Sequence, residues 1–120
     1  MDFFCYNKSM NKTDSVNFQH QIDKAVRGLI NFEPEKIILF GSFARGDSHS
    51  GSDIDILVIK KGLKNKSMFQ RRRQLDRFLE FGLPVETVVF TPSEIKERIK
   101  QNDYFLEDAL KEGKILYEKK

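Results

Sequence analysis

The sequence predicts an α/β (α+β) protein in which helices pack around a small mixed β-sheet. Three short runs rich in Ile, Leu, Val and Phe have the composition of strands, at residues 36–40, 53–59 and 85–90. Segments with apolar residues three and four positions apart, as in helices, precede, separate and follow these runs. The length of 120 residues is that of one small domain.

The N-terminal part predicts a helix, a strand and one helical turn. The helix is expected over residues 16–32, with Ser15 as its N-cap, and Pro34 prevents it from continuing. Residues 1–15 are expected to form a flexible extension, in which Met1 and Met10 are alternative starts, and residues 16–120 a single domain. The strand KIILF follows, and SFARGD after it is long enough for a single helical turn.

The second strand should be central in the sheet, because its residues beyond Asp55 are apolar on both faces. A helix over residues 66–81 comes next, and Gly82 and Pro84 end it ahead of the third strand.

Two further helices are expected in the C-terminal part. Thr91 as N-cap, Pro92 at the first helical position and Glu94 two residues later form the capping box of a helix over residues 91–101. The other covers residues 103–113, with Gly113 as its stop, and residues 114–120 form either a short strand or an extended tail.

The connections predict how the strands pair. A helix joins the second strand to the third, which favours a parallel pair with a right-handed crossover. The twelve residues 41–52 between the first and second strands are too few for such a crossover, so this pair is expected to be antiparallel. The end of the first strand and the starts of the other two then lie at one edge of the sheet.

Charge, hydropathy and cysteine content indicate which partners and which cellular compartment to expect. The net charge is +3, but residues 60–77 contain eight basic residues and one acidic residue. This segment has two interpretations, a surface for nucleic acid or an acidic partner, and a solvated helix face. No apolar run approaches the roughly 20 residues that span a membrane. The single Cys5 and an N-terminus unlike a signal peptide favour a cytoplasmic protein without a membrane partner.

Three carboxylates are expected at the shared edge of the sheet. Side chains alternate along a strand, so Asp53 and Asp55 face the same side, and parallel pairing brings Glu86 to them. Carboxylate oxygens with room for water and phosphate suit Mg²⁺ or Mn²⁺. Glu86 taken alone could also be an ordinary solvent-facing strand residue. The isolated Cys5 and the separated His20 and His49 do not indicate zinc; both histidines are expected at the surface.

Gly41 and Ser42 leave the first strand at the same edge. Glycine lets the backbone approach a ligand closely, and serine offers a hydroxyl and an N–H at the start of a helical turn, which together suit an anion. Phosphates beside divalent cations are what phosphoryl or nucleotidyl transfer requires.

At residues 41–58, GSFARGDSHSGSDIDILV resembles the signature of the minimal nucleotidyltransferases, small members of the DNA polymerase beta-like nucleotidyltransferase superfamily. Their pattern is Gly-Ser, ten residues, then Asp-x-Asp, and the spacing here is the same. The resemblance extends over roughly residues 16–119 and includes VETVVFTPSEI and LKEGKILYEK. It implies the nucleotidyltransferase fold and transfer of a nucleoside monophosphate, commonly AMP from ATP, to an acceptor hydroxyl.

The resemblance also implies roles for single residues. Asp53 and Asp55 would bind two metal ions, and Glu86 takes the place of the family's third carboxylate, which helps bind the catalytic metal and activates the attacking oxygen. This chain departs from the family there, because the family usually has Asp. A carboxylate displaced by about 1 Å can slow a reaction about 10²-fold.

Four residues are expected to bind the nucleotide. Gly41 and Ser42 would hold the triphosphate, and Arg45 and Ser52 fit the family's usual neighbours. Each of the last three has a second interpretation: Ser42 as a helix cap, Arg45 in a structural ion pair and Ser52 as a turn residue. Phe43, inside the loop, is left open between core packing and base stacking.

Family members of this size often pair with a separate all-helical protein of the HEPN type and act as its antitoxin, attaching AMP to a tyrosine hydroxyl. The resemblance therefore implies a HEPN-type partner. Two alternatives stay open: a catalytically weak module that acts by binding a helical partner, and a nucleic-acid-binding protein that uses residues 60–77.

Overall fold

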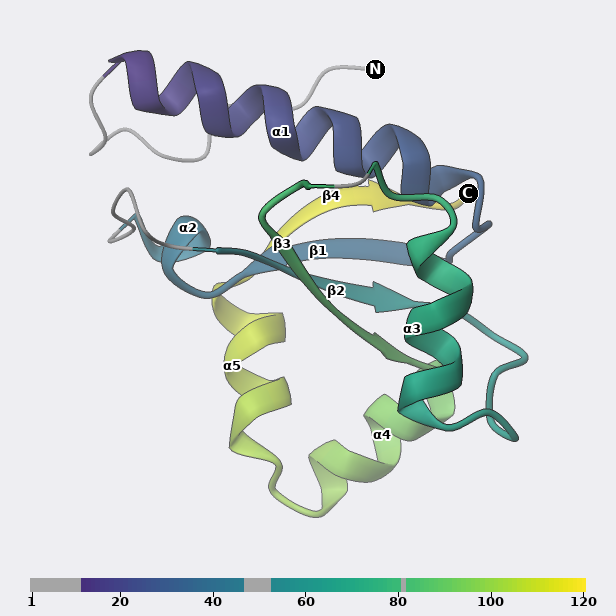
Figure 1. Cartoon of the computed structure of the whole chain (residues 1–120). Helices are drawn as coiled ribbons and strands as arrows, with labels where there is room; N and C mark the ends of the chain where they lie inside the picture. The colour runs from purple at the N-terminus through teal and green to yellow at the C-terminus, as the bar shows by residue number, and fades with distance from the viewer. Residues whose placement is uncertain (1–11, 47–52, 81) are drawn as a thin grey trace.

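The computed structural model describes residues 12–46, 53–80 and 82–120 (Figure 1). The elements in these ranges are α1 (Lys12–Ile30), β1 (Lys36–Phe40), α2 (Ser42–Arg45), β2 (Ile54–Ile59), α3 (Met68–Asp76), β3 (Val85–Phe90), α4 (Pro92–Lys100), α5 (Tyr104–Glu112) and β4 (Lys114–Glu118). The predicted mixed fold of helices around a small sheet is confirmed.

The four strands form one sheet in the order β3-β2-β1-β4. β1 and β2 are antiparallel, and β2 and β3 are parallel across the α3 crossover, as the connection lengths predict. The C-terminal segment is a strand and not a loose tail, because β4 pairs antiparallel with β1 at the edge of the sheet.

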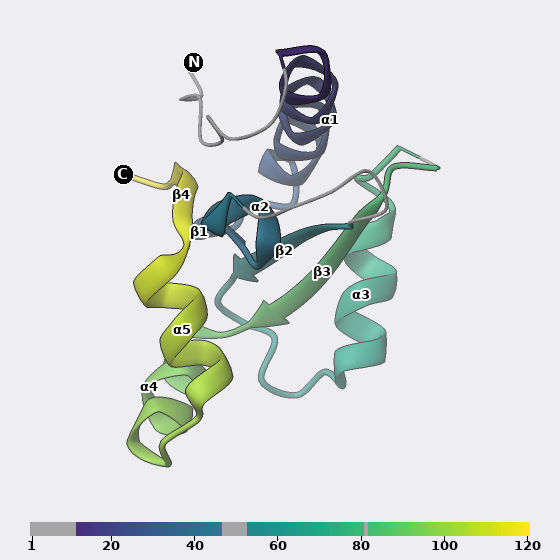
Figure 2. The same cartoon turned by 90° about the vertical axis from the view of Figure 1, so that its left-hand side faces the viewer.

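Apolar side chains cover both faces of the sheet. On one face, α1, α2 and α3 pack over alternate residues of the strands, including Leu39 and Ile56. On the other face, α4 and α5 pack over Ile38, Leu57 and Phe90. Figure 2 shows α3 and the α4–α5 pair on opposite sides of the sheet. Because β2 lies inside the sheet and is covered on both faces, residues 56–59 are buried, which confirms its predicted central place.

Two predicted helix ranges are wrong. α1 begins at Lys12, so Ser15 lies in its first turn and does not cap it. Residues 12–15 contain neither proline nor glycine, so no residue there prevents an extra turn. α3 covers only residues 68–76 of the predicted 66–81.

The shorter α3 has a physical explanation at each end. Ser67 accepts a hydrogen bond from Gln70 N–H, and the Gln70 side chain accepts from Ser67 N–H, so a capping box sets the start at Met68. At the other end, the amides of Phe78 and Leu79 donate three residues back instead of four, which tightens the last turn and ends the helix.

The predicted start of α4 and the predicted stop of α5 are confirmed. Thr91 and Glu94 form the predicted capping box, with Pro92 as the first residue of α4. Asp103 caps α5 by accepting from Leu106 N–H, and Gly113 follows its last residue. Within the described ranges, no helix has both the length and the apolar character needed to cross a membrane.

Candidate active site

The strand register brings the predicted acidic residues together. Asp55 on β2 lies directly opposite Glu86 on β3, in a parallel pair. Residues opposite each other on neighbouring strands are about 4.8 Å apart and point to the same face. Asp53 precedes β2 by one residue. The sheet therefore places three acidic residues at one edge, beside the end of β1, where Phe40 lies opposite Asp55.

The pKa of Asp55 reflects its burial and the charges of its neighbours. Burial raises the pKa of Asp55 above its ordinary value, and the negative charges of Glu86 and then Asp53 raise it further, while Arg45 lowers it. Asp55 is half-buried, whereas Asp53 and Glu86 are exposed. A cation bound among them would offset this repulsion.

The donor set fits a magnesium ion that uses substrate oxygens. Among the described residues, no three His, Cys, Asp or Glu side chains form a ready-made metal site. Mg²⁺ is usually held by one or two carboxylates together with waters and substrate phosphates, and not by an all-protein cage. Exposed carboxylates next to the half-buried Asp55 offer such a partial set.

Gly41 links this edge to the turn that follows β1. Its φ of 76° and ψ of −154° belong to a region that side chains other than glycine rarely adopt, and a Cβ there would overlap Asp55 Oδ2. Arg45 N–H donates to Gly41 C=O at 3.1 Å and Gly46 N–H to Ser42 C=O at 2.9 Å, which closes the predicted single helical turn. The glycine is thus needed both for the turn and for close approach to Asp55.

The structure decides between the open interpretations at two positions. Gly41 is the N-cap residue of α2 and no side chain makes a cap hydrogen bond, so Ser42 is not a helix cap. Phe43 is fully buried and packs edge-to-face on Phe18, with ring centroids 4.5 Å apart, so it belongs to the core. Arg45 is exposed and lies close enough to Asp55 to influence its pKa.

A pocket of about 460 Å³ adjoins the turn. Its lining combines predicted site residues with residues of α5: Phe40, Gly41, Ser42, Arg45, Asp55, Phe105, Asp108 and Glu112. The three α5 residues were not predicted from the sequence as site residues. They lie three and four positions apart on one side of the helix, but this periodicity does not reveal that they face the Gly41–Ser42 turn.

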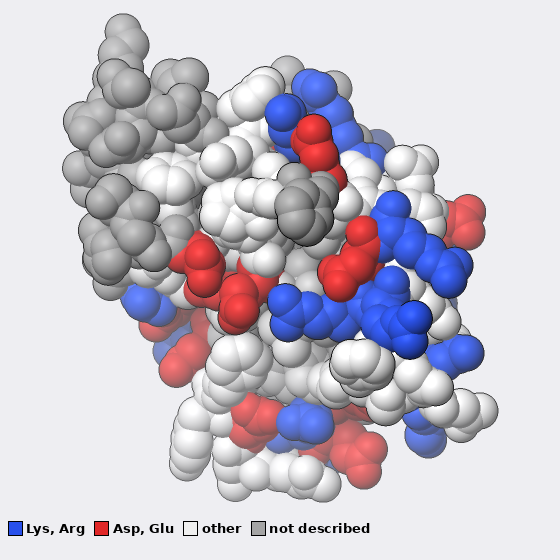
Figure 3. Space-filling model, viewed as in Figure 1, with Lys and Arg blue, Asp and Glu red and all other residues white. Residues whose placement is uncertain are grey.

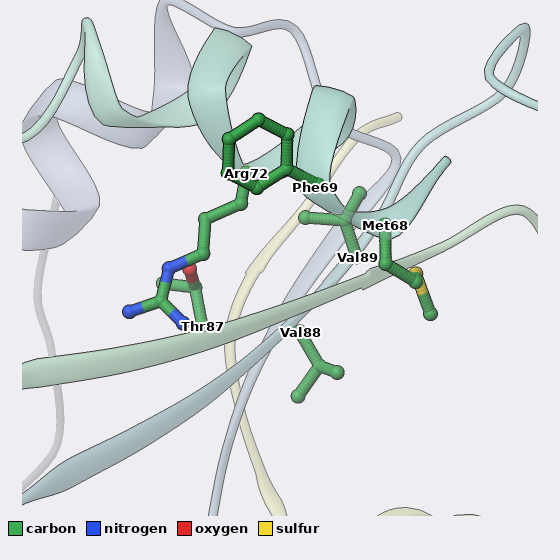
Figure 4. Close-up of a pocket in the computed structure, with 6 residues that line it drawn as sticks. All are labelled: Met68, Phe69, Arg72, Thr87, Val88 and Val89. Carbon is green, nitrogen blue, oxygen red and sulfur yellow. The ribbon is translucent and has the colours of Figure 1, made fainter. Parts of the chain in front are cut away.

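A second pocket of about 340 Å³ lies between α3 and β3, and its lining includes Met68, Phe69, Arg72 and Thr87. Figure 4 shows Arg72 reaching from α3 to Thr87, the neighbour of Glu86 in the chain. Phe69 is 70% exposed. This largely apolar hollow therefore lies between α3 and β3, and Asp53, Asp55 and Glu86 are not among the residues that line it.

The basic segment is not uniformly exposed. Figure 3 shows Lys and Arg side chains gathered over α3, and Arg72 and Arg73 are exposed. Arg71, in contrast, is only 3% exposed and pairs with Glu94 of α4. One of the eight basic residues of segment 60–77 is therefore part of the protein interior.

Ser52 and His49 lie outside the described residues, and His20 is exposed as expected.

A family model described as polymerase beta, nucleotidyltransferase matches residues 21–120. The chain belongs to this nucleotidyltransferase family. The match includes both halves of the Gly-Ser and Asp-x-Asp pattern, so the resemblance inferred from those residues is confirmed, and so is nucleotidyl transfer as the class of activity.

Two curated relatives of this nucleotidyltransferase come from Methanocaldococcus jannaschii. "Putative protein adenylyltransferase MJ0604" is 32% identical over 109 residues, which are 90% of this chain and 100% of the relative. "Putative protein adenylyltransferase MJ1305" is 32% identical over 87 residues, covering 69% of this chain and 58% of the relative. A solved structure described as "Crystal structure of a putative nucleotidyltransferase from Sulfolobus solfataricus" is 36% identical; the match covers 65% of this chain and 78% of that chain, with a TM-score of 0.46.

Proposed function

We propose that this nucleotidyltransferase transfers AMP from ATP to a hydroxyl group of a partner protein, with two Mg²⁺ ions, or Mn²⁺ in their place, as cofactors. The observation that carries the proposal is the register that sets Asp55 opposite Glu86 beside the Gly41 turn and its pocket. The names of the two relatives support a protein as the acceptor and adenylyl as the group transferred.

Asp53, Asp55 and Glu86 are the proposed metal ligands. Bound Mg²⁺ would supply charge compensation for the triphosphate and a fixed orientation for the reacting oxygens. Gly41, Ser42 and Arg45 line the pocket beside Asp55 and would hold the phosphates, with Arg45 adding a positive charge. Ser52, at the far end of the same loop in the sequence, is proposed as a further phosphate contact.

The reaction forms one bond and breaks one at the α-phosphorus, and one proton is transferred. The acceptor oxygen attacks the α-phosphorus of ATP, the bond from that phosphorus to the α–β bridging oxygen breaks, and pyrophosphate leaves. The proton of the acceptor hydroxyl passes to a base. Glu86 is the proposed base because it is exposed and lies on β3, an outermost strand of the sheet. The side chain of Glu86 is one methylene longer than the Asp that the family usually has, and its carboxylate must occupy the same place.

The acceptor is proposed to be a HEPN-type helical protein that this chain controls as an antitoxin. The pocket between α3 and β3 supports a protein partner. Its apolar residues Met68 and Phe69 are 42% and 70% exposed, and its Thr87 follows the proposed base in the chain. Exposed apolar side chains around a hollow are typical of protein-binding surfaces.

ATP labelled on the α-phosphate tests the proposal, with Mg²⁺ and the product of the neighbouring reading frame as acceptor. Label should appear on the acceptor, and Asp53→Asn with Asp55→Asn should abolish it, whereas ATP labelled on the γ-phosphate should leave the acceptor unlabelled. Asp76→Asn, which changes an exposed carboxylate of α3, is the matched control and should keep wild-type labelling. Equal labelling by the wild type and the double variant would refute catalysis at this edge.

The two alternatives give different results in related experiments. A binding module would hold the partner without labelling it, and the Asp53 and Asp55 substitutions would leave that binding unchanged. Nucleic-acid binding through residues 60–77 would be steeply salt-dependent and lost on substitution of Arg72 and Arg73. Arg71 must be left out of that test, because it is buried and paired with Glu94, so its substitution is expected to destabilise the fold itself.

A further inference from the structure

We propose that the side of α5 facing the Gly41–Ser42 turn is the nucleoside subsite, where Phe105 contacts the base and the carboxylates of Asp108 and Glu112 accept hydrogen bonds from the ribose hydroxyls. This inference rests on the proposed function, since it assumes that a nucleoside triphosphate binds beside Asp55. It adds specificity residues from a helix that contains no part of the Gly-Ser and Asp-x-Asp pattern.

The pocket has two different walls, one for each end of a bound nucleotide. Gly41, Ser42 and Arg45 form the wall next to Asp55, and α5 forms the rest of the lining together with Phe40. A volume of about 460 Å³ lies within the range of about 300–1,000 Å³ typical of small-molecule sites. Glu86 is not part of this lining, so a ligand in the pocket leaves the side of Glu86 open for the acceptor.

Phe105 is arranged as a platform for a flat ring. It is 50% exposed although it is large and apolar. Its ring packs edge-to-face on Phe40, with centroids 5.4 Å apart and planes at 88°, so one side of the ring is supported by the end of β1. A supported, half-exposed aromatic ring at the rim of a pocket suits the face of a nucleobase.

The charges along α5 indicate how the nucleotide is oriented in the pocket. Asp108 and Glu112 are both exposed, and they lie four residues apart and therefore on the same side of the helix. Two carboxylates repel a triphosphate but accept hydrogen bonds from neutral hydroxyl groups. The phosphates should therefore lie at the Arg45 end, with the nucleoside against α5.

Binding measurements with three probes separate the parts of the ligand: ATP, tripolyphosphate, and 2′,3′-dideoxy-ATP, which lacks both ribose hydroxyls. The variants are Phe105→Ala and a double variant, Asp108→Asn with Glu112→Gln. Tyr104→Ala is the matched aromatic control, because Tyr104 precedes Phe105 in α5 and is 71% exposed but does not line the pocket. Glu107→Gln on the same helix is the matched carboxylate control. Circular dichroism and thermal unfolding check that each variant is folded.

Phe105→Ala should weaken ATP binding at least about tenfold, as expected for loss of base stacking, and change tripolyphosphate binding less than twofold. The double variant should remove the preference of the wild type for ATP over the dideoxy nucleotide. Equal effects of Phe105→Ala and Tyr104→Ala, or an unchanged preference in the double variant, would overturn the subsite while leaving the proposed function intact. A folded wild type that binds neither ATP nor tripolyphosphate would overturn both.

Discussion

Glu94→Gln is expected to destabilise the fold by about 3 kcal/mol at neutral pH, because it breaks the ion pair with Arg71. The Arg71 guanidinium donates from Nη1 to Glu94 Oε1 at 2.7 Å and from Nη2 to Oε2 at 2.8 Å. It also donates to the backbone carbonyls of Lys66, Leu63 and Val89. One buried side chain therefore connects α3, the preceding loop, β3 and α4.

The magnitude follows from the pKa of Glu94. Hydrogen bonding to Arg71 is the largest cause that lowers this pKa from 4.5 to about 2, and one pKa unit corresponds to about 1.4 kcal/mol. The ionised carboxylate thus contributes about 3 kcal/mol, and its side chain is only 24% exposed, so solvent screens it weakly. Removing one partner of a fully buried pair costs about 3–5 kcal/mol in general, so a cost at or below the lower end of that range is expected for this part-buried pair.

Urea denaturation at several pH values tests both the size and the sign. Because the folded pKa of Glu94 lies below its unfolded value, the stabilisation is complete above about pH 5 and is lost as pH falls towards 2. The difference between wild type and Glu94→Gln should therefore shrink from pH 5 to pH 3. Glu97→Gln, an exposed change on the same helix, should stay within about 0.5 kcal/mol of wild type. A Glu94→Gln variant as stable as Glu97→Gln at pH 7, or a pH-independent difference, would refute the reasoning.

Three further substitutions test the site and the packing around it. Gly41→Ala should cost about 2 kcal/mol in thermal or urea unfolding and weaken ATP binding, because it combines a strained backbone with overlap on Asp55; unchanged stability would contradict this geometry. Asp55→Asn should raise the midpoint of thermal unfolding at pH 7 in EDTA. The pKa of Asp55 is raised, which means that the ionised carboxylate opposes folding, so removing its charge should stabilise the protein. This increase in the unfolding midpoint should vanish near pH 3, where the wild-type carboxyl is protonated. Gly28→Ala in α1 should destabilise by about 1–3 kcal/mol in urea, since a Cβ there would overlap the backbone oxygen of Phe78. A stabilised variant, as at an exposed helix position, would show that this contact is loose.

The local chemistry of the chain was enough to predict the elements that carry the site. Thr91, Pro92 and Glu94 predict the start of α4 because a capping box involves only neighbouring residues. The alternation of side chains along a strand, together with a crossover long enough for a helix, predicts that Asp55 and Glu86 meet. The predicted helix ends are wrong where the local sequence allows several starts or stops, as before Val16 in α1 and after Asp76 in α3.

Other features required the tertiary structure because they depend on which distant segments pack together. The sequence of α3 shows three consecutive arginines, and only the packing of α3 on β3, next to Glu94 at the start of α4, decides that Arg71 turns inward while Arg72 stays exposed. The pairing of β4 with β1 likewise decides that the C-terminal segment is a strand. α5 provides Phe105 and Asp108 to the pocket only because it packs across the end of β1. Local periodicity determines which side of a helix is polar, but what that side faces depends on the packing of the whole domain.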